Sequence, residues 1–163
     1  MKVKHWLWIF AALSLLTTAF IWGNSLPSIP DSAAQSTAVA ETVQPIVDPQ
    51  QKIESSTFHN YLRKAAHLAE FFALGLFVCG FTVCLGLELK KRLISLPILL
   101  VLLVAVGDEF IQHFSGRGSL VADVVLDFAG ALAGLLIANL IYKLINSVGN
   151  EFIRSAKSHI KRK

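Results

Sequence analysis

The chain has 163 residues, of which 54% are hydrophobic and only 16% are charged. Soluble domains carry about 25% charged residues, so the composition excludes an ordinary soluble domain. The net charge is +4, but the basic residues follow the ends of hydrophobic runs and no nucleic-acid-reading motif accompanies them, so we expect no nucleic-acid partner.

Four hydrophobic runs are each long enough for a membrane-spanning helix, which needs about 17 to 25 residues. They cover His5 to Trp22, Ala65 to Leu87, Leu93 to Ile111 and Val121 to Ile145. We therefore predict an all-α polytopic membrane protein with four transmembrane helices. The first run is interpreted as an uncleaved anchor, because no A-x-A-like cleavage site follows it.

The runs divide the chain into four parts. Residues 1–24 form an N-terminal transmembrane anchor, and residues 25–58 are rich in Ser, Ala, Gln and Pro, which predicts a disordered extracytoplasmic loop. Residues 59–146 form a three-helix core. Residues 147–163 form a basic cytoplasmic tail, either an interfacial helix along the inner leaflet or a solvated, frayed segment.

Charge asymmetry predicts the orientation. If the N-terminus is cytoplasmic, that side holds eleven basic and two acidic residues, a net +9, and the other side holds four basic and nine acidic residues, a net −5. Because cytoplasmic loops are enriched in Lys and Arg, both termini are predicted to be cytoplasmic.

Charged and strongly polar residues lie within or at the ends of the last three runs, toward the extracytoplasmic side. They are Arg63, Lys64, His67, Glu70, Asp108, Glu109, Gln112, His113, Arg117, Asp123 and Asp127. A centred ionisable group costs about 2.5 to 3.5 kcal/mol on insertion scales and persists mainly where it pairs or faces a polar interior. This polar cluster is therefore the predicted functional site.

Helical spacing places the cluster residues on facing surfaces. One helix face carries Arg63, His67 and Glu70. On the next helix, Asp108 shares a face with Gln112, and Glu109 shares a face with His113. On the last helix, one face carries Asp123, Asp127, Gly130 and Gly134. The two glycines form a G-x-x-x-G pair, which lets a neighbouring helix approach closely. We expect a deep acidic layer beneath a shallower, mixed layer of basic and acidic groups.

These motifs, in their order, resemble the VanZ-like membrane proteins. The likeness rests on Arg63-Lys64-x-x-His67-x-x-Glu70-Phe71, Asp108-Glu109-x-x-Gln112-x-Phe114, Gly116-Arg117, and Asp123-x-x-x-Asp127-x-x-Gly130-x-x-x-Gly134. It covers about 75 residues, and the stretch before Arg117 is one residue shorter than the family's usual pattern. The resemblance implies a protein of the bacterial cell envelope, located in the cell membrane, from a family named for reduced susceptibility to the glycopeptide teicoplanin.

Three functional readings remain open. The first is an outer-leaflet pocket that binds or acts on a lipid or cell-wall precursor headgroup, with His67, Glu70, Asp108 and Glu109 as candidate catalytic residues and Arg63, Lys64, Gln112, Arg117, Asp123 and Asp127 as ligand-binding residues. The second is a non-catalytic structural or partner-binding membrane protein. The third is an ion, proton or metal site, for which the His67–Glu70 and Glu109–His113 spacings are suitable. The pattern assigns no metal ligand and indicates no cofactor.

Overall fold

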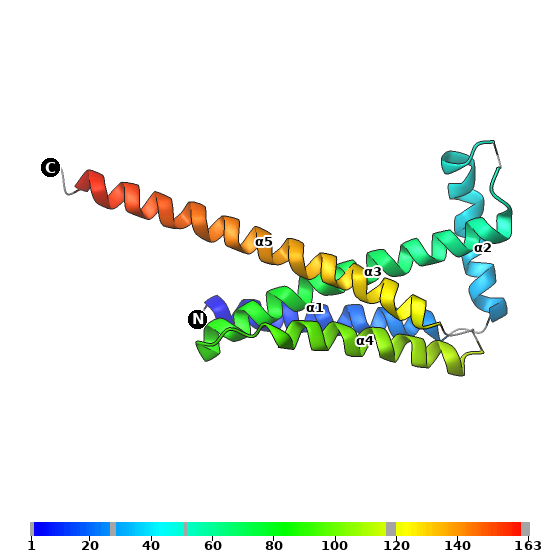
Figure 1. Cartoon of the computed structure of the whole chain (residues 1–163), viewed down its shortest axis with the longest axis horizontal. Coiled ribbons are helices and arrows are strands. Elements are labelled where there is room, and N and C mark those ends of the chain that lie inside the picture. Colours follow the sequence, from blue (N-terminus) through cyan, green and yellow to red (C-terminus); the bar gives the residue numbers. More distant parts are fainter. Residues whose placement is uncertain (1, 27–28, 51, 117–119, 161–163) are drawn as a thin grey trace.

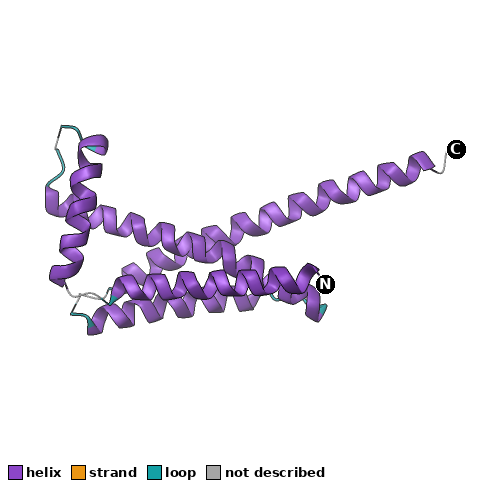
Figure 2. Cartoon of the chain, turned by 180° about the vertical axis from the view of Figure 1, so that it is seen from behind, coloured by secondary structure: helices purple, strands orange, loops and turns teal. Residues whose placement is uncertain are grey.

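The computed structural model describes residues 2–26, 29–50, 52–116 and 120–160. Its helices are α1 (Lys2–Ser25), α2 (Ile29–Val47), α3 (Ser55–Leu89), α4 (Ser95–Phe114) and α5 (Val121–Ile160) (Figure 1). The described residues contain no strand (Figure 2). The prediction of an all-α fold is confirmed.

Four of the five helices are long and apolar enough to cross a membrane. The spans are Val3–Ser25, Ser55–Leu89, Ser95–Phe114 and Val121–Gly149, so the prediction of four transmembrane helices is also confirmed. The four membrane-length helices alternate in direction, so the start of α1 and the end of α5 lie toward the same end of the bundle (Figure 1). The opposite end, which carries α2, the end of α4 and the start of α5, is called the α2 end below.

Most helix ends lie beyond the hydrophobic runs that predicted the helices, although α4 begins two residues inside its run and α5 begins at the predicted Val121. α3 begins at Ser55, ten residues before the predicted run, and its first turns include Phe58, whose side chain is buried. α5 has 40 residues, about 60 Å at 1.5 Å per residue, whereas the hydrocarbon core is about 30 Å thick. Hydropathy therefore located the apolar centre of each helix, but only some of its ends.

The structure differs from the predicted disordered loop, because most of residues 25–58 form α2 and the start of α3. α2 lies across the α2 end of the bundle (Figure 1). Its sequence contains several alanines and a glutamate, which favour helix, and Ala40 is completely buried. After the helix, the backbone N–H of Ile53 donates to Asp48 Oδ2 at 2.8 Å. These contacts offset part of the ordering entropy that argued for disorder.

α3 and α5 pack with their backbones in close contact. A Cβ atom on Gly134 would overlap the carbonyl oxygen of Phe72, and one on Gly75 would overlap that of Ala131. A Cβ added at Gly130 would lie 2.7 Å from the carbonyl oxygen of Leu68. Small residues at such crossings let two helices approach closely. This contact fixes the position of α5, and hence of its acidic residues, against α3.

Candidate functional site

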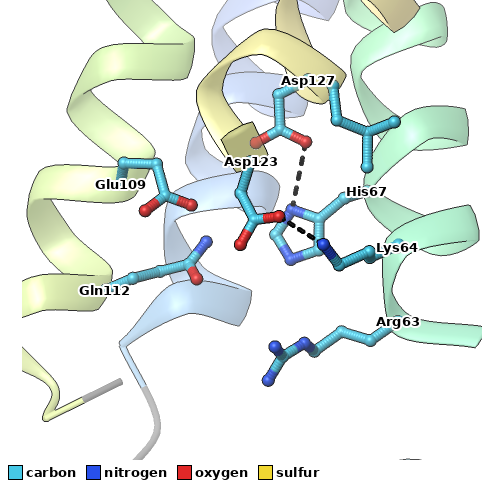
Figure 3. Close-up of a pocket in the computed structure, with 8 residues that line it drawn as sticks. Arg63, Lys64, His67, Glu109, Gln112, Asp123 and Asp127 are labelled. Atoms are coloured by element: carbon cyan, nitrogen blue, oxygen red, sulfur yellow. Dashed lines mark hydrogen bonds and ion pairs between the residues drawn. The ribbon is translucent and has the colours of Figure 1, made fainter. Parts of the chain in front are cut away.

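A small polar pocket lies between α3, α4 and α5 toward the α2 end (Figure 3). It is lined by Arg63, Lys64 and His67 from α3, Glu109 and Gln112 from α4, and Asp123, Leu126 and Asp127 from α5. Its volume of about 20 Å³ is enough for roughly one water molecule. The interior can therefore hold a single small group, and anything larger must contact the rim.

Asp108 is the most enclosed charged residue of the described part of the chain, with 0% of its surface exposed. Ser25, at the end of α1, donates from Oγ to Asp108 Oδ1 at 2.7 Å. Gln112, one turn along α4, donates from Nε2 to Asp108 Oδ2 at 2.7 Å. A buried carboxylate needs such donors to offset its loss of hydration. The carboxylate is therefore held in one orientation by hydrogen bonds from two helices.

His67 lies between the two most buried aspartates. Its Nδ1 atom is 3.6 Å from Asp108 Oδ2 and 3.9 Å from Asp127 Oδ1. Asp127 is only 2% exposed. Because the three residues come from α3, α4 and α5, they mark the point where the three core helices converge. We refer to His67, Asp108 and Asp127 as the central triad.

The pocket rim carries the basic residues. Lys64 Nζ pairs with Asp123 Oδ1 at 2.6 Å and joins α3 to α5. The helical spacing alone allows Lys64 to extend toward lipid headgroups, but in the structure its ammonium bonds to this neighbouring helix. Arg63 lies farther from Asp127, on the outer side of the pocket (Figure 3). In the described part of the pocket, the basic groups thus lie outside the central triad.

Two glutamates complete the polar cluster in different ways. Glu70 accepts a hydrogen bond from Asn24 Nδ2 at its Oε1 atom, at 3.1 Å. Glu109 is buried and accepts from the backbone N–H of Leu120 at 3.2 Å, immediately before α5 begins. An acidic side chain at that position satisfies an unpaired backbone donor and interacts favourably with the helix dipole. Glu109 therefore fixes the start of the helix that carries Asp123 and Asp127.

The structure brings nine of the ten predicted catalytic and ligand-binding residues to one end of the bundle. The tenth, Arg117, lies outside the described residues. His113 is exposed and its ring packs edge-to-face on Phe114, with centroids 5.7 Å apart; it does not line the pocket. Gly130 and Gly134, for which a packing role is predicted, lie against the backbone of α3.

Sequence reasoning missed Asn24 and Ser25. Both were assigned to the boundary between the anchor and the loop, yet each donates to a carboxylate of the polar cluster. A signal was present, since two hydrogen-bonding side chains end the first hydrophobic run on the same membrane side as the acids. α1 is therefore part of the site and more than an anchor.

One protein-family model matches the chain: VanZ/LLP1, over residues 10–142. The match covers most of α1, all of α2, α3 and α4, and α5 up to residue 142, so it extends well beyond the motifs noted in the sequence. Searches of curated proteins and of solved structures found no match.

Proposed function

Because this multi-pass membrane protein belongs to the VanZ/LLP1 family, we propose that its polar pocket binds the anionic headgroup of a membrane lipid or lipid-linked cell-wall precursor. The observation that carries the proposal is the arrangement of charge. Basic side chains lie at the outer rim, and buried carboxylates lie deeper between the same three helices. A phosphate can contact the rim while its lipid tail stays in the bilayer.

Arg63 is the residue best suited to hold a phosphate. Its guanidinium lies at the outer side of the pocket (Figure 3), and an arginine can make two parallel charge-assisted hydrogen bonds to one phosphate. Lys64 is already paired with Asp123 and is 44% exposed, so it supplies positive charge at the same rim. The small interior leaves no room for a whole headgroup, which restricts deep contacts to one small group.

The direction of the pocket follows from the predicted orientation. If both termini are cytoplasmic, the α2 end faces the outside of a bacterial cell membrane and the pocket is reached from the outer leaflet. Lipid-linked cell-wall precursors are displayed there. An altered susceptibility to teicoplanin is the phenotype we expect from loss of the pocket.

A catalytic version of the proposal would use His67, Glu70, Asp108 and Glu109 for proton transfer at the bound headgroup. Asp108 does not line the pocket, and both of its oxygens accept hydrogen bonds within the protein, so it would have to move to exchange a proton with a bound headgroup. Binding needs no such change. We therefore place binding before catalysis in the proposal.

A structural role is the second candidate, and specific contacts favour it. The hydrogen bond from Ser25 to Asp108 joins α1 to α4, Gln112 orients the same carboxylate from within α4, and Lys64 with Asp123 joins α3 to α5. Interhelical polar contacts in membranes average about 0.6 kcal/mol. On this reading the cluster joins the helices and binds nothing.

Arg63→Lys separates the two readings. The substitution keeps the charge and alters neither the Asp108 hydrogen bonds nor the Lys64–Asp123 pair, but removes the planar fork that binds phosphate. We expect native mass spectrometry of the gently solubilised variant to show at least fivefold less retained anionic precursor lipid, with unchanged thermal stability. Arg92→Lys, at an exposed arginine toward the opposite end, is the matched control. Equal retention by both variants, or no anionic lipid on the parent protein, would refute the binding proposal.

A further inference from the structure

We propose that the central triad of His67, Asp108 and Asp127 binds one divalent metal ion of the Zn²⁺ or Mn²⁺ type. Each residue offers one ligand atom, and the three atoms lie within 4.8 Å of one another. Two of the separations are 3.6 and 3.9 Å. They are too long for hydrogen bonds, which require about 2.7 to 3.2 Å between nitrogen and oxygen.

The separations suit a common bound ion. Zn²⁺ binds imidazole nitrogen at about 2.0 to 2.1 Å and carboxylate oxygen at about 2.0 to 2.2 Å, which places neighbouring ligand atoms roughly 3 to 3.5 Å apart. For most pairs of ligand atoms in the triad, the separation therefore needs to shorten by about 1 Å or less for the atoms to bind one ion. No change in the helix backbones is required for closure on this scale.

The charge of the triad also calls for a cation. Asp108 and Asp127 are 0% and 2% exposed, and two buried carboxylates side by side need a positive partner or loss of their charge. The lysine that lines the pocket, Lys64, is engaged with Asp123. Arg63 lies on the outer side of the pocket (Figure 3). A protonated His67 would supply one positive charge to the pair, whereas a divalent ion would balance both carboxylates at once.

The surroundings of Asp108 resemble those of a metal-ligating carboxylate. Hydrogen bonds from Ser25 and Gln112 hold both of its oxygens in place, and such outer partners orient metal ligands and strengthen binding. Oδ2 keeps a further lone pair for an ion. One imidazole with two carboxylates favours Zn²⁺ or Mn²⁺ over Ca²⁺, which prefers six to eight oxygen ligands.

The pocket supplies a path and an open coordination position. His67 and Asp127 line it, and its volume of about 20 Å³ accepts about one water molecule. Three protein ligands plus one exchangeable position is the arrangement of reactive zinc sites. If the proposed headgroup binding is correct, a phosphate oxygen could take that position; this last step alone depends on the proposed function.

The test is metal content. The parent protein, purified with a tag that binds no metal, is equilibrated with Zn²⁺ or Mn²⁺, dialysed and measured by inductively coupled plasma mass spectrometry. We expect about one ion per chain. His67→Gln and Asp127→Asn should each weaken binding at least tenfold. Glu88→Gln is the matched control, because this exposed carboxylate lies at the other end of α3, away from the pocket.

A monodisperse parent that binds neither ion overturns the inference, as does an equal loss of metal in the Glu88→Gln control. Should Asp127→Asn fail to fold, the parent stoichiometry and His67→Gln decide. Co²⁺ substitution gives a second readout, because its visible spectrum should change in His67→Gln and remain in the control. Metal without retained lipid refutes only the headgroup proposal, whereas lipid without metal refutes only the metal site.

Discussion

Replacing Gly134 with alanine should separate α3 from α5. The added Cβ would overlap the carbonyl oxygen of Phe72 and lie 3.0 Å from the backbone nitrogen of Leu76. Both are backbone atoms of one helix, so no side-chain rotation can relieve the overlap. A carbon normally stays about 3.3 Å or more from a carbonyl oxygen, so α5 must move away by on the order of 1 Å.

The expected cost follows from that shift. Inserting a carbon into a tightly packed contact typically destabilises a protein by about 1 to 3 kcal/mol, and here it loosens a helix pair whose backbones are in contact. Asp127 lies two turns from Gly134 on the same face of α5, so the separation also enlarges its 3.9 Å distance to His67. We therefore expect both a lower free energy of unfolding and weaker binding of ligands in the polar pocket.

The assay is unfolding of the detergent-solubilised protein, followed by tryptophan fluorescence as SDS increases. Gly149→Ala is the matched control, since Gly149 is on the same helix and a Cβ added there would have no other atom within 4 Å. At that position alanine should be neutral or stabilising by up to about 1 kcal/mol. If Gly134→Ala unfolds at the same SDS concentration as the parent, the backbone contact between α3 and α5 is not present in the membrane protein.

Three further predictions concern other contacts. Ser25→Ala removes the hydroxyl that donates to the buried carboxylate of α4 and should destabilise the protein by about 1 to 3 kcal/mol in the same assay; a neutral result would mean that water replaces the hydroxyl. A double-mutant cycle of Lys64→Met and Asp123→Asn should give a coupling free energy of only about 0.2 to 1 kcal/mol, because the lysine side chain is half exposed. A coupling free energy well above this would indicate that the pocket rim is less accessible to water than the structure shows. Cysteines at Ser56 and Lys91 test orientation: an impermeant thiol reagent on intact cells should label the first and not the second, and reversed labelling would place the pocket on the cytoplasmic side.

The polar cluster could be predicted from sequence because two simple periodicities agree. Residues at i, i+4 and i+7 must share a helix face, and the short connection before α5 forces Asp108 and Asp127 to similar depths. The hydrophobic runs likewise determined the number of spans. Each of these inferences uses geometry within one helix or across one short turn.

What could not be predicted depends on packing between distant helices. Ser25 meets Asp108 across 83 residues, and no periodicity states how α1 is rotated against α4. The pairing of Lys64 with Asp123 depends on the same kind of information, since it requires the crossing of α3 over α5. α2 was missed because its polar composition suggested disorder, whereas its helix propensity and the burial of Ala40 favour helix.

The order of the polar residues along the chain has a consequence for biogenesis. Asn24, Ser25 and Lys64, which donate to acids on other helices, all precede Asp108 and Asp123 in the sequence. A ribosome therefore delivers these donors to the membrane before the two aspartates. An aspartate entering lipid alone costs about 2.5 to 3.5 kcal/mol. When α4 and then α5 enter the membrane, the donors on α1 and α3 that bond to their aspartates are already inserted. The order of donors and acids along the chain therefore favours insertion from the N-terminus onward.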